Sequence, residues 1–294
     1  LVTKSHAWTL AGMTRDLNNS LERMKTDYID LFFVHSVGDT ADFNDAMRAW
    51  AEKKKADGKI RLFGFSTHSN MEACMLGAAK LGWIDAIMMS YNFRLMHRDE
   101  MKRAVAACAE AGIGLTAMKT QASFSANFYA SIGSETDDAL KMTENFIKKG
   151  YTAEQAKLKV VWENPNIASI CSAMPNMTIL QANVAAALNK KELSTGDRHR
   201  LQQYARQTAP GYCAGCSQIC ESAIDREVPI SDILRYAMYY NSYGERDTAL
   251  RLFDSLSSDV KSNILMADYS KAEKRCPQNI RIGKVLEKAY KDLG

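Results

Sequence analysis

Residues 27–36, DYIDLFFVHS, contain the stretch that decides the fold of this chain. The central residues are apolar without interruption and mostly β-branched or aromatic, which is typical of a strand buried on both faces. Residues 58–69, GKIRLFGFSTHS, repeat the pattern of a turn, an apolar run and a polar end. Strands of this kind belong to parallel sheets that helices cover on both faces. The two stretches therefore predict an α/β protein.

The segments around these two stretches alternate between strands and helices. Predicted strands lie at 1–5, 28–36, 60–68, 85–92, 113–119 and 164–174, and predicted helices at 9–25, 41–56, 70–81, 98–111, 152–163, 178–190 and 194–207. Residues 119–150 are expected to be irregular with helical pieces. Six such units suit a (β/α)8 barrel without its first two βα units, or an open doubly wound sheet. No Gly-rich dinucleotide turn follows any strand, which favours the barrel.

Polar side chains follow the apolar core of five predicted strands, each at its carboxyl end. They are Lys4; His35 and Ser36; Ser66, Thr67 and His68; Ser90, Tyr91 and Asn92; and Lys119. In a barrel of parallel strands these ends surround one mouth, where the active site lies. The sequence therefore predicts a single site built from successive strand ends.

The composition argues against several classes of function. The chain has 294 residues, enough for one large domain and a small one, and a net charge of +4 that is too small and evenly spread for nucleic acid. No apolar run reaches the length needed to cross a membrane. The chain begins LVTKSHAW without Met, so we expect it to start partway through a longer protein. A cytoplasmic location is the default expectation.

Four short motifs resemble the aldo-keto reductase family: TK at 3–4, DYIDLFFVHS at 27–36, GKIRLFGFSTHS at 58–69 and SYN at 90–92. The resemblance covers roughly residues 1–190. It implies a (β/α)8 TIM barrel that reduces a small carbonyl compound reversibly to an alcohol with NAD(P)H, using a tetrad of Asp, Tyr, Lys and His. By this resemblance Lys4 is the tetrad lysine and His35 the tetrad histidine. The family's Asp and Tyr lie in the first two βα units, which this chain does not contain.

The residue types suit this chemistry. Hydride attack on a carbonyl leaves an alkoxide that needs a proton, and a tyrosine can donate it when a lysine ammonium lowers the tyrosine pKa. A histidine can hydrogen-bond the carbonyl oxygen and orient the substrate. Because the chain alone would lack the general acid, two interpretations remain. Either the protein is longer, which we favour, or the chain is a non-catalytic electron-transfer or interaction module on a degenerate barrel.

The resemblance also implies residues that hold the cofactor. Ser66 and Thr67 match the Ser-Asn pair that holds the nicotinamide carboxamide, with Thr in place of Asn, and Tyr91 matches an aromatic residue that stacks on the nicotinamide. Met88 stands where the family has a carboxamide-binding Gln.

The adenosine end of the cofactor is expected along residues 172–188. Asn183 matches the adenine-contacting position, and Gln181 lies nearby. The basic residues that usually bind a 2′-phosphate are missing between Pro175 and Asn183, which favours NADH over NADPH.

Four of the seven cysteines have the sequence context of metal ligands. Cys213, Cys216 and Cys220 are spaced C-x2-C-x3-C, and Cys276 is followed by Pro, an ending typical of ferredoxin-type clusters. Thiolates this close are soft ligands suited to Zn or to an iron–sulfur cluster, and an intracellular enzyme is not expected to hold them as disulfides. The other three are expected to be small buried thiols: Cys74, Cys108 and Cys171.

Some aldo-keto reductases carry a C-terminal part similar to a two-cluster ferredoxin, with the run C-x2-C-x2-C-x3-C-P in each half. Residues 212–245 resemble the first half and residues 272–293 the second, but Ile224 stands at the fourth cysteine position of the first run. The resemblance implies one [4Fe–4S] cluster, with Zn as the alternative, on the four cysteines that remain: Cys213, Cys216, Cys220 and Cys276. The gap before Cys220 is one residue longer than in the family.

The sequence thus predicts two domains, a partial barrel at 1–207 and a small helical iron–sulfur domain at 208–294. Residues 231–253 are expected to be a packing helix of the second domain. The cluster would relay single electrons, with an electron-transfer protein as a possible partner, or would only stabilise the small domain.

Overall fold

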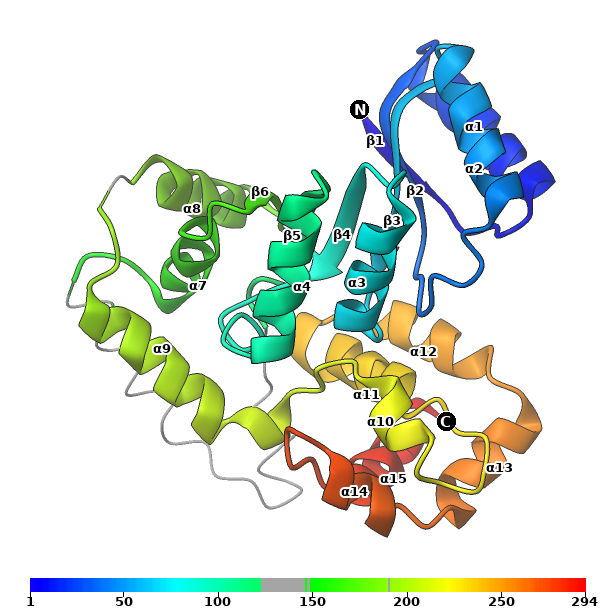
Figure 1. Cartoon of the computed structure of the whole chain (residues 1–294). Helices are drawn as coiled ribbons and strands as arrows, with labels where there is room; N and C mark the ends of the chain where they lie inside the picture. Colours follow the sequence, from blue (N-terminus) through cyan, green and yellow to red (C-terminus); the bar gives the residue numbers. More distant parts are fainter. Residues whose placement is uncertain (123–145, 147–148, 190) are drawn as a thin grey trace. The chain divides into compact units, whose positions relative to one another are not determined.

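The computed structural model describes residues 1–122, 146, 149–189 and 191–294. The chain forms two compact units, which are described separately (Figure 1). The sheet unit consists of Leu1–Tyr91, Met96–Thr120 and Val161–Ala173. The helical unit consists of Asn92–Leu95, Met174–Gly294 and the described part of Gln121–Val160. The predicted irregular stretch at 119–150 lies largely outside the described residues. The predicted domain boundary after residue 207 stays a prediction.

The sheet unit contains six parallel strands in the order of the sequence. The strands are β1 (Val2–Ser5), β2 (Ile29–Val34), β3 (Ile60–Thr67), β4 (Ala86–Ser90), β5 (Gly114–Met118) and β6 (Ile167–Cys171). All six predicted strands are confirmed. A parallel sheet whose strands follow chain order is what a (β/α)8 barrel contains, whereas a doubly wound sheet reverses its order at a switch point. The sheet is therefore consistent with the predicted barrel.

Helices connect successive strands, as expected for parallel pairing. They are α1 (Leu10–Met24), α2 (Asp45–Ala56), α3 (Met71–Leu81) and α4 (Asp99–Glu110), and α7 (Ala153–Trp162) precedes β6. The ends of these helices follow local signals. Thr9 caps α1 by accepting from the amide of Gly12, and Asn44 caps α2 by accepting from that of Met47. Gly82 ends α3 in the left-handed region, where a side chain would be strained.

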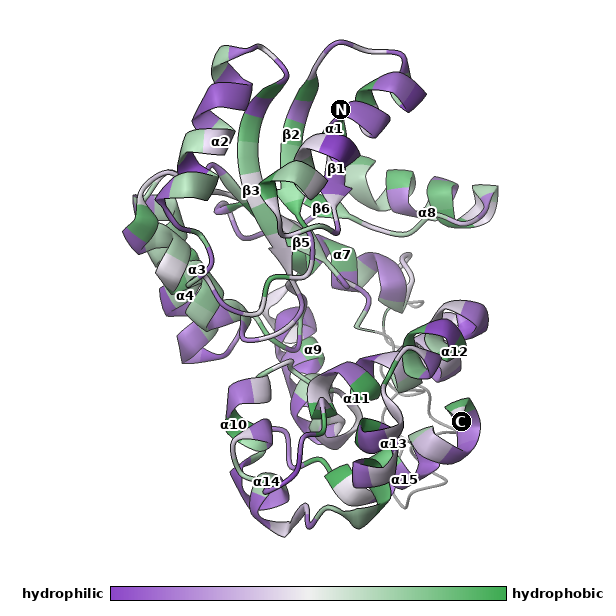
Figure 2. Ribbon diagram, turned by 90° about the vertical axis from the view of Figure 1, so that its right-hand side faces the viewer, coloured by the Kyte–Doolittle hydropathy of each residue, from purple (hydrophilic) through white to green (hydrophobic). Residues whose placement is uncertain are grey.

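Aromatic rings fill the space between β2, β3 and their helices. Phe63 stacks on Trp83 with ring centroids 5.7 Å apart, and Phe43 packs against Phe65 at 5.2 Å. Figure 2 shows the apolar residues along β2 and β3 in green. This packing makes the central strands a rigid support for the polar residues at their carboxyl ends.

The two edge strands are less covered than the central ones. Val2 of β1 is 54% exposed, and most residues of β6 are exposed or half-buried, with Ile167 the exception. Cys171 is therefore exposed, so the prediction of a buried thiol there is wrong, while Cys74 and Cys108 are buried as predicted. The reason is that β6 is an edge strand in the part of the sheet that the structure describes.

The helical unit begins with α8 (Met177–Leu188) and α9 (Thr195–Gln207) and continues through shorter helices. These are η1 (Ala209–Gly211), α10 (Ser217–Glu221), α11 (Ile230–Met238), the π-helical turn η2 (Tyr239–Tyr243), α12 (Arg246–Asp254), α13 (Ser258–Met266), α14 (Ser270–Arg275) and α15 (Ile282–Leu293). The single helix predicted at 231–253 is broken, because Gly244 adopts a left-handed conformation with φ of 72° and ends the π turn. No helix among the described residues is long and apolar enough to span a membrane.

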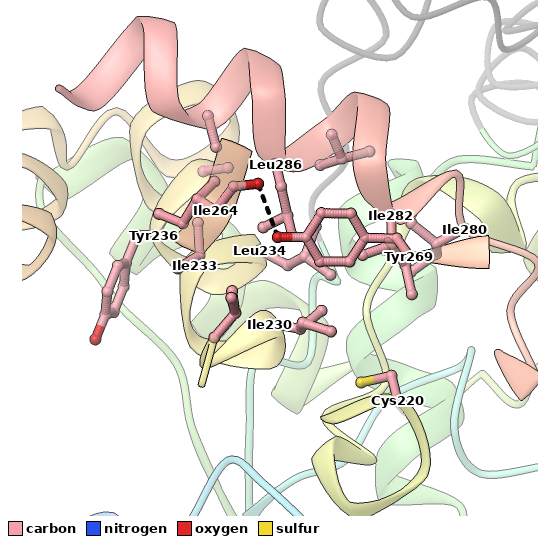
Figure 3. Close-up of a cluster of buried hydrophobic side chains, with 14 of the residues drawn as sticks. Cys220, Ile230, Ile233, Leu234, Tyr236, Ile264, Tyr269, Ile280, Ile282 and Leu286 are labelled. Atoms are coloured by element: carbon pink, nitrogen blue, oxygen red, sulfur yellow. Dashed lines mark hydrogen bonds between the residues drawn. The ribbon is translucent and has the colours of Figure 1, made fainter. Parts of the chain in front are cut away.

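The core of the helical unit is a cluster of apolar side chains from α11, α12, α13 and α15 (Figure 3). Ile230, Ile233 and Leu286 are buried in it, and the Tyr269 hydroxyl donates to the carbonyl oxygen of Ile264 at 2.8 Å. Cys220 belongs to the same cluster. Residues of the segment 231–253, which was predicted to be a packing helix, thus contribute side chains to this core.

Candidate functional site

The carboxyl ends of the strands in the sheet unit bring polar side chains into neighbouring positions. The His35 amide donates to the carbonyl of Ser5 at 2.8 Å, and the Val37 amide donates to that of Ser66 at 2.8 Å. These bonds extend the strand pairing past β2, so residues after β1, β2 and β3 lie side by side. Ser36 has a φ of 61°, a left-handed conformation that is uncommon outside glycine and marks this turn as a place where backbone strain is held.

His35 has two other imidazoles near it. Its ring centroid is 4.5 Å from that of His6 and 6.2 Å from that of His68, both in edge-to-face arrangements. Its Nδ1 is 2.9 Å from the Oγ of Ser66, and the Ser36 amide donates to the same Oγ at 3.3 Å. His35 is thus oriented by groups from the ends of β1, β2 and β3.

His68 repeats this arrangement one strand further along. Its Nδ1 lies 3.4 Å from the Oγ of Ser90, at the end of β4. His68 was predicted among the strand-end residues, whereas His6 was not predicted as a neighbour of His35. Its signal was available, since His6 follows the predicted first strand directly.

Lys4 is half-buried on β1, opposite Phe33 of β2 in the register. Burial lowers the pKa of its ammonium group, and electrostatic interaction with Cys171 of β6 opposes that shift. A lowered pKa makes the charged form of Lys4 less favourable than it would be in water.

The predicted nicotinamide-binding residues are buried. Ser66 and Thr67 are fully buried, and the Thr67 hydroxyl donates to the carbonyl of Ser69 at 2.8 Å. Tyr91 is 2% exposed, its hydroxyl accepts from the Nδ2 of Asn164 at 2.8 Å, and burial raises its pKa. A ring that stacks on a nicotinamide must expose one face, so stacking by Tyr91 would require its neighbours to move.

The predicted adenosine-binding residues lie on α8, in the helical unit. Gln181 is exposed and Asn183 is half-buried. Asn176 caps this helix by accepting from the amide of Ile179, and the Gln155 side chain donates to the carbonyl of Ala182 at 3.2 Å. The two predicted residues are therefore on one helix that α7 supports.

The four predicted cluster cysteines gather in the helical unit. Burial is the main cause that raises the pKa of the Cys213 thiol, and electrostatic interactions with Cys216, Cys220 and Cys276 raise it further. Burial likewise raises the pKa of Cys220 to about 12, with Cys216 and Cys276 among the smaller causes. Among the described residues, no three His, Cys, Asp or Glu side chains are arranged to hold one metal ion.

The loop from Cys213 to Cys216 is shaped by a glycine. Gly215 has a φ of 77°, and its amide lies 3.4 Å from the Sγ of Cys213, to which it donates. Backbone amides that point at cysteine sulfurs are typical of loops that hold thiolate ligands, because they stabilise negative charge on sulfur.

A buried polar network precedes this loop. The Tyr212 hydroxyl accepts from the Nδ2 of Asn92 at 3.0 Å, and burial raises the Tyr212 pKa to about 12. Arg94 donates to the Oγ1 of Thr208 at 2.6 Å, and its guanidinium lies over the ring of Tyr204 at 5.1 Å. The segment that follows Tyr91 in the chain is thereby fixed to the segment that leads into the cysteine loop.

Comparison with known proteins finds a family whose sequence model matches most of this chain. The sequence model of the Aldo/keto reductase family matches residues 3–203. An aldo-keto reductase of Fusarium vanettenii is 24% identical over 226 residues, which cover 69% of this chain and 60% of that protein. The uncharacterized oxidoreductase YqkF of Bacillus subtilis is 27% identical over 205 residues, 65% of either chain. The chain thus spans less than two thirds of the length of these curated relatives.

Solved structures share the fold. The aldo-keto reductase AKR11C1 of Bacillus halodurans has a TM-score of 0.52 and 22% identity, and the match covers 69% of this chain and 70% of that one. An aldo-keto reductase of Klebsiella pneumoniae, in complex with NADPH, has a TM-score of 0.52 and 22% identity, with 70% of this chain and 69% of that one covered.

Proposed function

This chain belongs to the aldo/keto reductase family, and from that premise we propose that it takes part in the reversible, NAD(P)-linked reduction of a small carbonyl compound to an alcohol. The observation that carries the proposal is the approach of His35 to Ser66 at the carboxyl ends of neighbouring parallel strands, with Lys4 on the adjacent strand β1. In barrels of this kind the strand ends are where substrates react.

The roles follow from the chemistry of each group. His35 would hydrogen-bond the carbonyl oxygen and so stabilise the negative charge that develops there as hydride arrives. Lys4, whose pKa burial lowers, would stabilise the anionic form of a neighbouring acid and so favour proton donation to that oxygen. In this family that acid is a tyrosine, supported by an aspartate, from the first two βα units.

We infer that two further βα units close the barrel in the functional protein. The proposal is supported by the exposure of Val2 on β1 and of most of β6, because barrel strands are paired on both sides and covered by helices. The same units would supply the tyrosine and the aspartate.

The cofactor would be held by the residues that the family resemblance assigns to it. Ser66 and Thr67 lie at the end of β3, where a nicotinamide carboxamide would be bound, while Tyr91 could stack on the ring only after its neighbours move. Asn183 and Gln181 on α8 would contact the adenosine part, near a helix N-terminus of the kind that binds phosphate. The bound nicotinamide supplies the hydride. The complex of the Klebsiella pneumoniae protein with NADPH supports NADPH as one form, although the absence of basic residues between Pro175 and Asn183 favours NADH.

We also propose that Cys213, Cys216, Cys220 and Cys276 bind one [4Fe–4S] cluster. The mutual electrostatic interaction of these thiols and the Gly215 amide at Cys213 support this assignment. Zinc would need all four sulfurs around one ion at about 2.3 Å, whereas a cluster binds each thiolate at a different iron and so keeps the sulfurs further apart. The distances between the sulfurs would therefore distinguish zinc, the alternative, from the proposed cluster. Its role would be to relay single electrons, to an electron-transfer protein, or to stabilise the helical unit.

Turnover by the full-length protein tests the enzyme proposal. Oxidation of NADH and NADPH is measured with a panel of aldehydes and ketones for the wild type and for Lys4→Met and His35→Ala. We expect each substitution to lower kcat by about 100-fold or more, as is usual for groups that act on the reacting oxygen. The exposed His199 of α9 offers a matched control, and His199→Ala should keep the wild-type rate. Absence of turnover in the wild type would favour a non-catalytic module instead.

Iron and sulfide analysis under anaerobic conditions tests the cluster. We expect about four irons and four sulfides per chain, and their loss in Cys216→Ala. Cys171→Ser is the control, because Cys171 is exposed on β6 and lies outside the proposed set. One zinc per chain, or iron content unchanged in Cys216→Ala, would contradict the assignment.

A further inference from the structure

We propose that Ser66 is a positioning residue that fixes the tautomer of His35, so that the neutral imidazole carries its hydrogen on Nε2 and can donate it to the substrate oxygen. The inference rests on the proposed function for the role of His35, but the tautomer itself is a property of the chain. The Oγ of Ser66 is 2.9 Å from the Nδ1 of His35.

The hydroxyl of Ser66 has one hydrogen to donate and two lone pairs with which to accept. The Ser36 amide donates to this Oγ at 3.3 Å, which occupies one lone pair. Among the described residues, the hydroxyl has two polar neighbours in hydrogen-bonding range, the Ser36 amide and the His35 imidazole. The amide cannot accept, so Nδ1 of His35 is the acceptor within reach of the hydroxyl hydrogen.

Because Ser66 is buried, its hydroxyl hydrogen needs an acceptor within the protein. Ser66 is fully buried, and a buried donor without an acceptor is costly, so buried hydroxyl hydrogens are almost always bonded. If His35 were protonated on Nδ1, two N–H groups would donate to one oxygen and the hydroxyl hydrogen would point at no acceptor among the described residues. If Nδ1 accepts, every polar atom in this set is satisfied.

The tautomer of the ring follows directly. A neutral imidazole carries one hydrogen, so a ring that accepts at Nδ1 donates at Nε2. That nitrogen lies on the far side of the ring from Ser66, and it is the one that could meet a carbonyl oxygen. A histidine that stabilises an oxyanion must donate, so Ser66 would set the tautomer that the reaction needs.

The backbone and the neighbouring rings hold this arrangement in place. The Ser36 amide reaches Ser66 because Ser36 adopts a left-handed conformation, with φ of 61°, directly after His35. Rings that follow the adjacent strands, His6 at 4.5 Å and His68 at 6.2 Å, pack edge-to-face with the His35 imidazole. The orientation of the ring is therefore fixed by contacts from three successive strand ends.

The chain contains an internal control. His68 stands in the same relation to Ser90 as His35 does to Ser66, but the Nδ1 to Oγ distance is longer, 3.4 Å. Ser90→Ala removes the hydroxyl of this second pair and leaves the first intact.

The test is a nitrogen NMR spectrum of the protein with ¹⁵N-labelled histidine, recorded at a pH where His35 is neutral. The chain has five histidines, so their imidazole signals can be separated, and His35→Gln assigns the relevant pair. The ¹⁵N shifts distinguish a protonated from an unprotonated ring nitrogen. We expect the Nε2–H form for His35 in the wild type and in Ser90→Ala, and a shift towards a mixture of tautomers in Ser66→Ala.

An Nδ1–H form in the wild type would overturn the inference, as would an unchanged tautomer in a folded Ser66→Ala protein. If Ser66→Ala does not fold, the wild-type spectrum alone decides between the two tautomers. The readout needs no turnover, so a protein that reduces no carbonyl but shows the expected tautomer would refute the proposed function and leave this inference standing.

Discussion

Gly64 allows β3 and β4 to approach each other at a single point. A β-carbon built there would lie 1.8 Å from the carbonyl oxygen of Ala86, a backbone atom that cannot give way without moving the strand. We expect Gly64→Ala to destabilise the sheet unit by roughly 3 kcal/mol, the upper end of what overpacking usually costs. Urea unfolding of the variant and the wild type measures this difference.

Gly114 provides the matched control for this substitution. It lies in β5, which pairs with β4 on its other side, and a β-carbon there would meet nothing nearer than 3.7 Å, the carbonyl oxygen of Asp85. Gly114→Ala should therefore change the free energy of unfolding by less than about 1 kcal/mol. Equal effects of the two substitutions would mean that the close approach at Gly64 does not limit the sheet.

Single residues also show what the sequence could not predict. Lys4, His35 and Ser66 were predicted to lie at one edge because parallel strands end there, and the contact between His35 and Ser66 agrees with that geometry. The exposure of Cys171 was not foreseen, because an isolated cysteine in apolar surroundings is predicted to be buried whether its strand lies inside a sheet or at its edge.

At the scale of the element, the start of α9 depends on one buried carboxylate. Asp197 accepts from the Ser194 amide and hydroxyl and from the Tyr151 hydroxyl, and it forms an ion pair with Lys149. Burial acts to raise its pKa, but these partners together outweigh burial and lower the pKa to about 2. The charged form is thus strongly preferred in the folded chain.

The free energy of unfolding should therefore decrease as the pH falls through a defined range. Because the folded pKa lies below the unfolded value, the contribution of Asp197 is complete above pH 4 or so and is lost as pH falls from about 4 towards 2. The loss should amount to about 2 kcal/mol, and Asp197→Asn should remove it. Thermal unfolding between pH 7 and pH 2 measures the effect. Asp259→Asn, an exposed acid in the first turn of α13, should leave the pH dependence unchanged.

The hydrogen bond between Asn92 and Tyr212 joins the segment after β4 to the cysteine loop within the helical unit. Both side chains are buried, so Tyr212→Phe removes a hydrogen bond between buried groups and should cost about 1–3 kcal/mol. A double-mutant cycle with Asn92→Ala isolates the pair, and we expect a coupling energy of about 0.5–3 kcal/mol. Additive effects of the two substitutions would show that the bond contributes nothing of its own.

The helices illustrate which element boundaries a sequence can predict. The caps at Thr9 and Asn44 and the glycine at position 82 lie where residue preferences predict them, and the helices between the strands were predicted closely. The break at Gly244 was missed because a single glycine inside an apolar helical pattern is tolerated in many helices. Here the π turn that precedes it leads to a left-handed residue, which ends the helix.

At the scale of the whole molecule, the order and direction of the six strands followed from the alternation of strands and helices. Closure of a barrel stays a proposal, because it would need strands that pair with the outer sides of β1 and β6. Binding of a metal species by Cys213, Cys216, Cys220 and Cys276 also stays a proposal, because it depends on the distances between the sulfurs, which the sequence does not determine.

The edge strands β1 and β6 are largely exposed in the described part of the sheet, which favours association between copies of the chain. We expect this 294-residue chain to self-associate with increasing concentration, because edge strands without a cover pair with other chains. Val2→Lys places a charge on β1 and should shift the distribution towards the monomer in analytical ultracentrifugation. Leu62→Lys is the control, since Leu62 is 44% exposed but lies on the interior strand β3. A monomeric wild type at all concentrations would show that the edges are protected.

The most direct test of the central claim is transfer of deuterium from the cofactor to a product. The full-length protein is incubated with NADH or NADPH that carries deuterium at the transferable position, together with an aldehyde panel, and the alcohols are analysed by mass spectrometry. We predict one deuterium on the carbinol carbon with the wild type, and a loss of about 100-fold or more in its rate of appearance with His35→Ala. No labelled alcohol from the wild type, or labelling at an unchanged rate in His35→Ala, would contradict it.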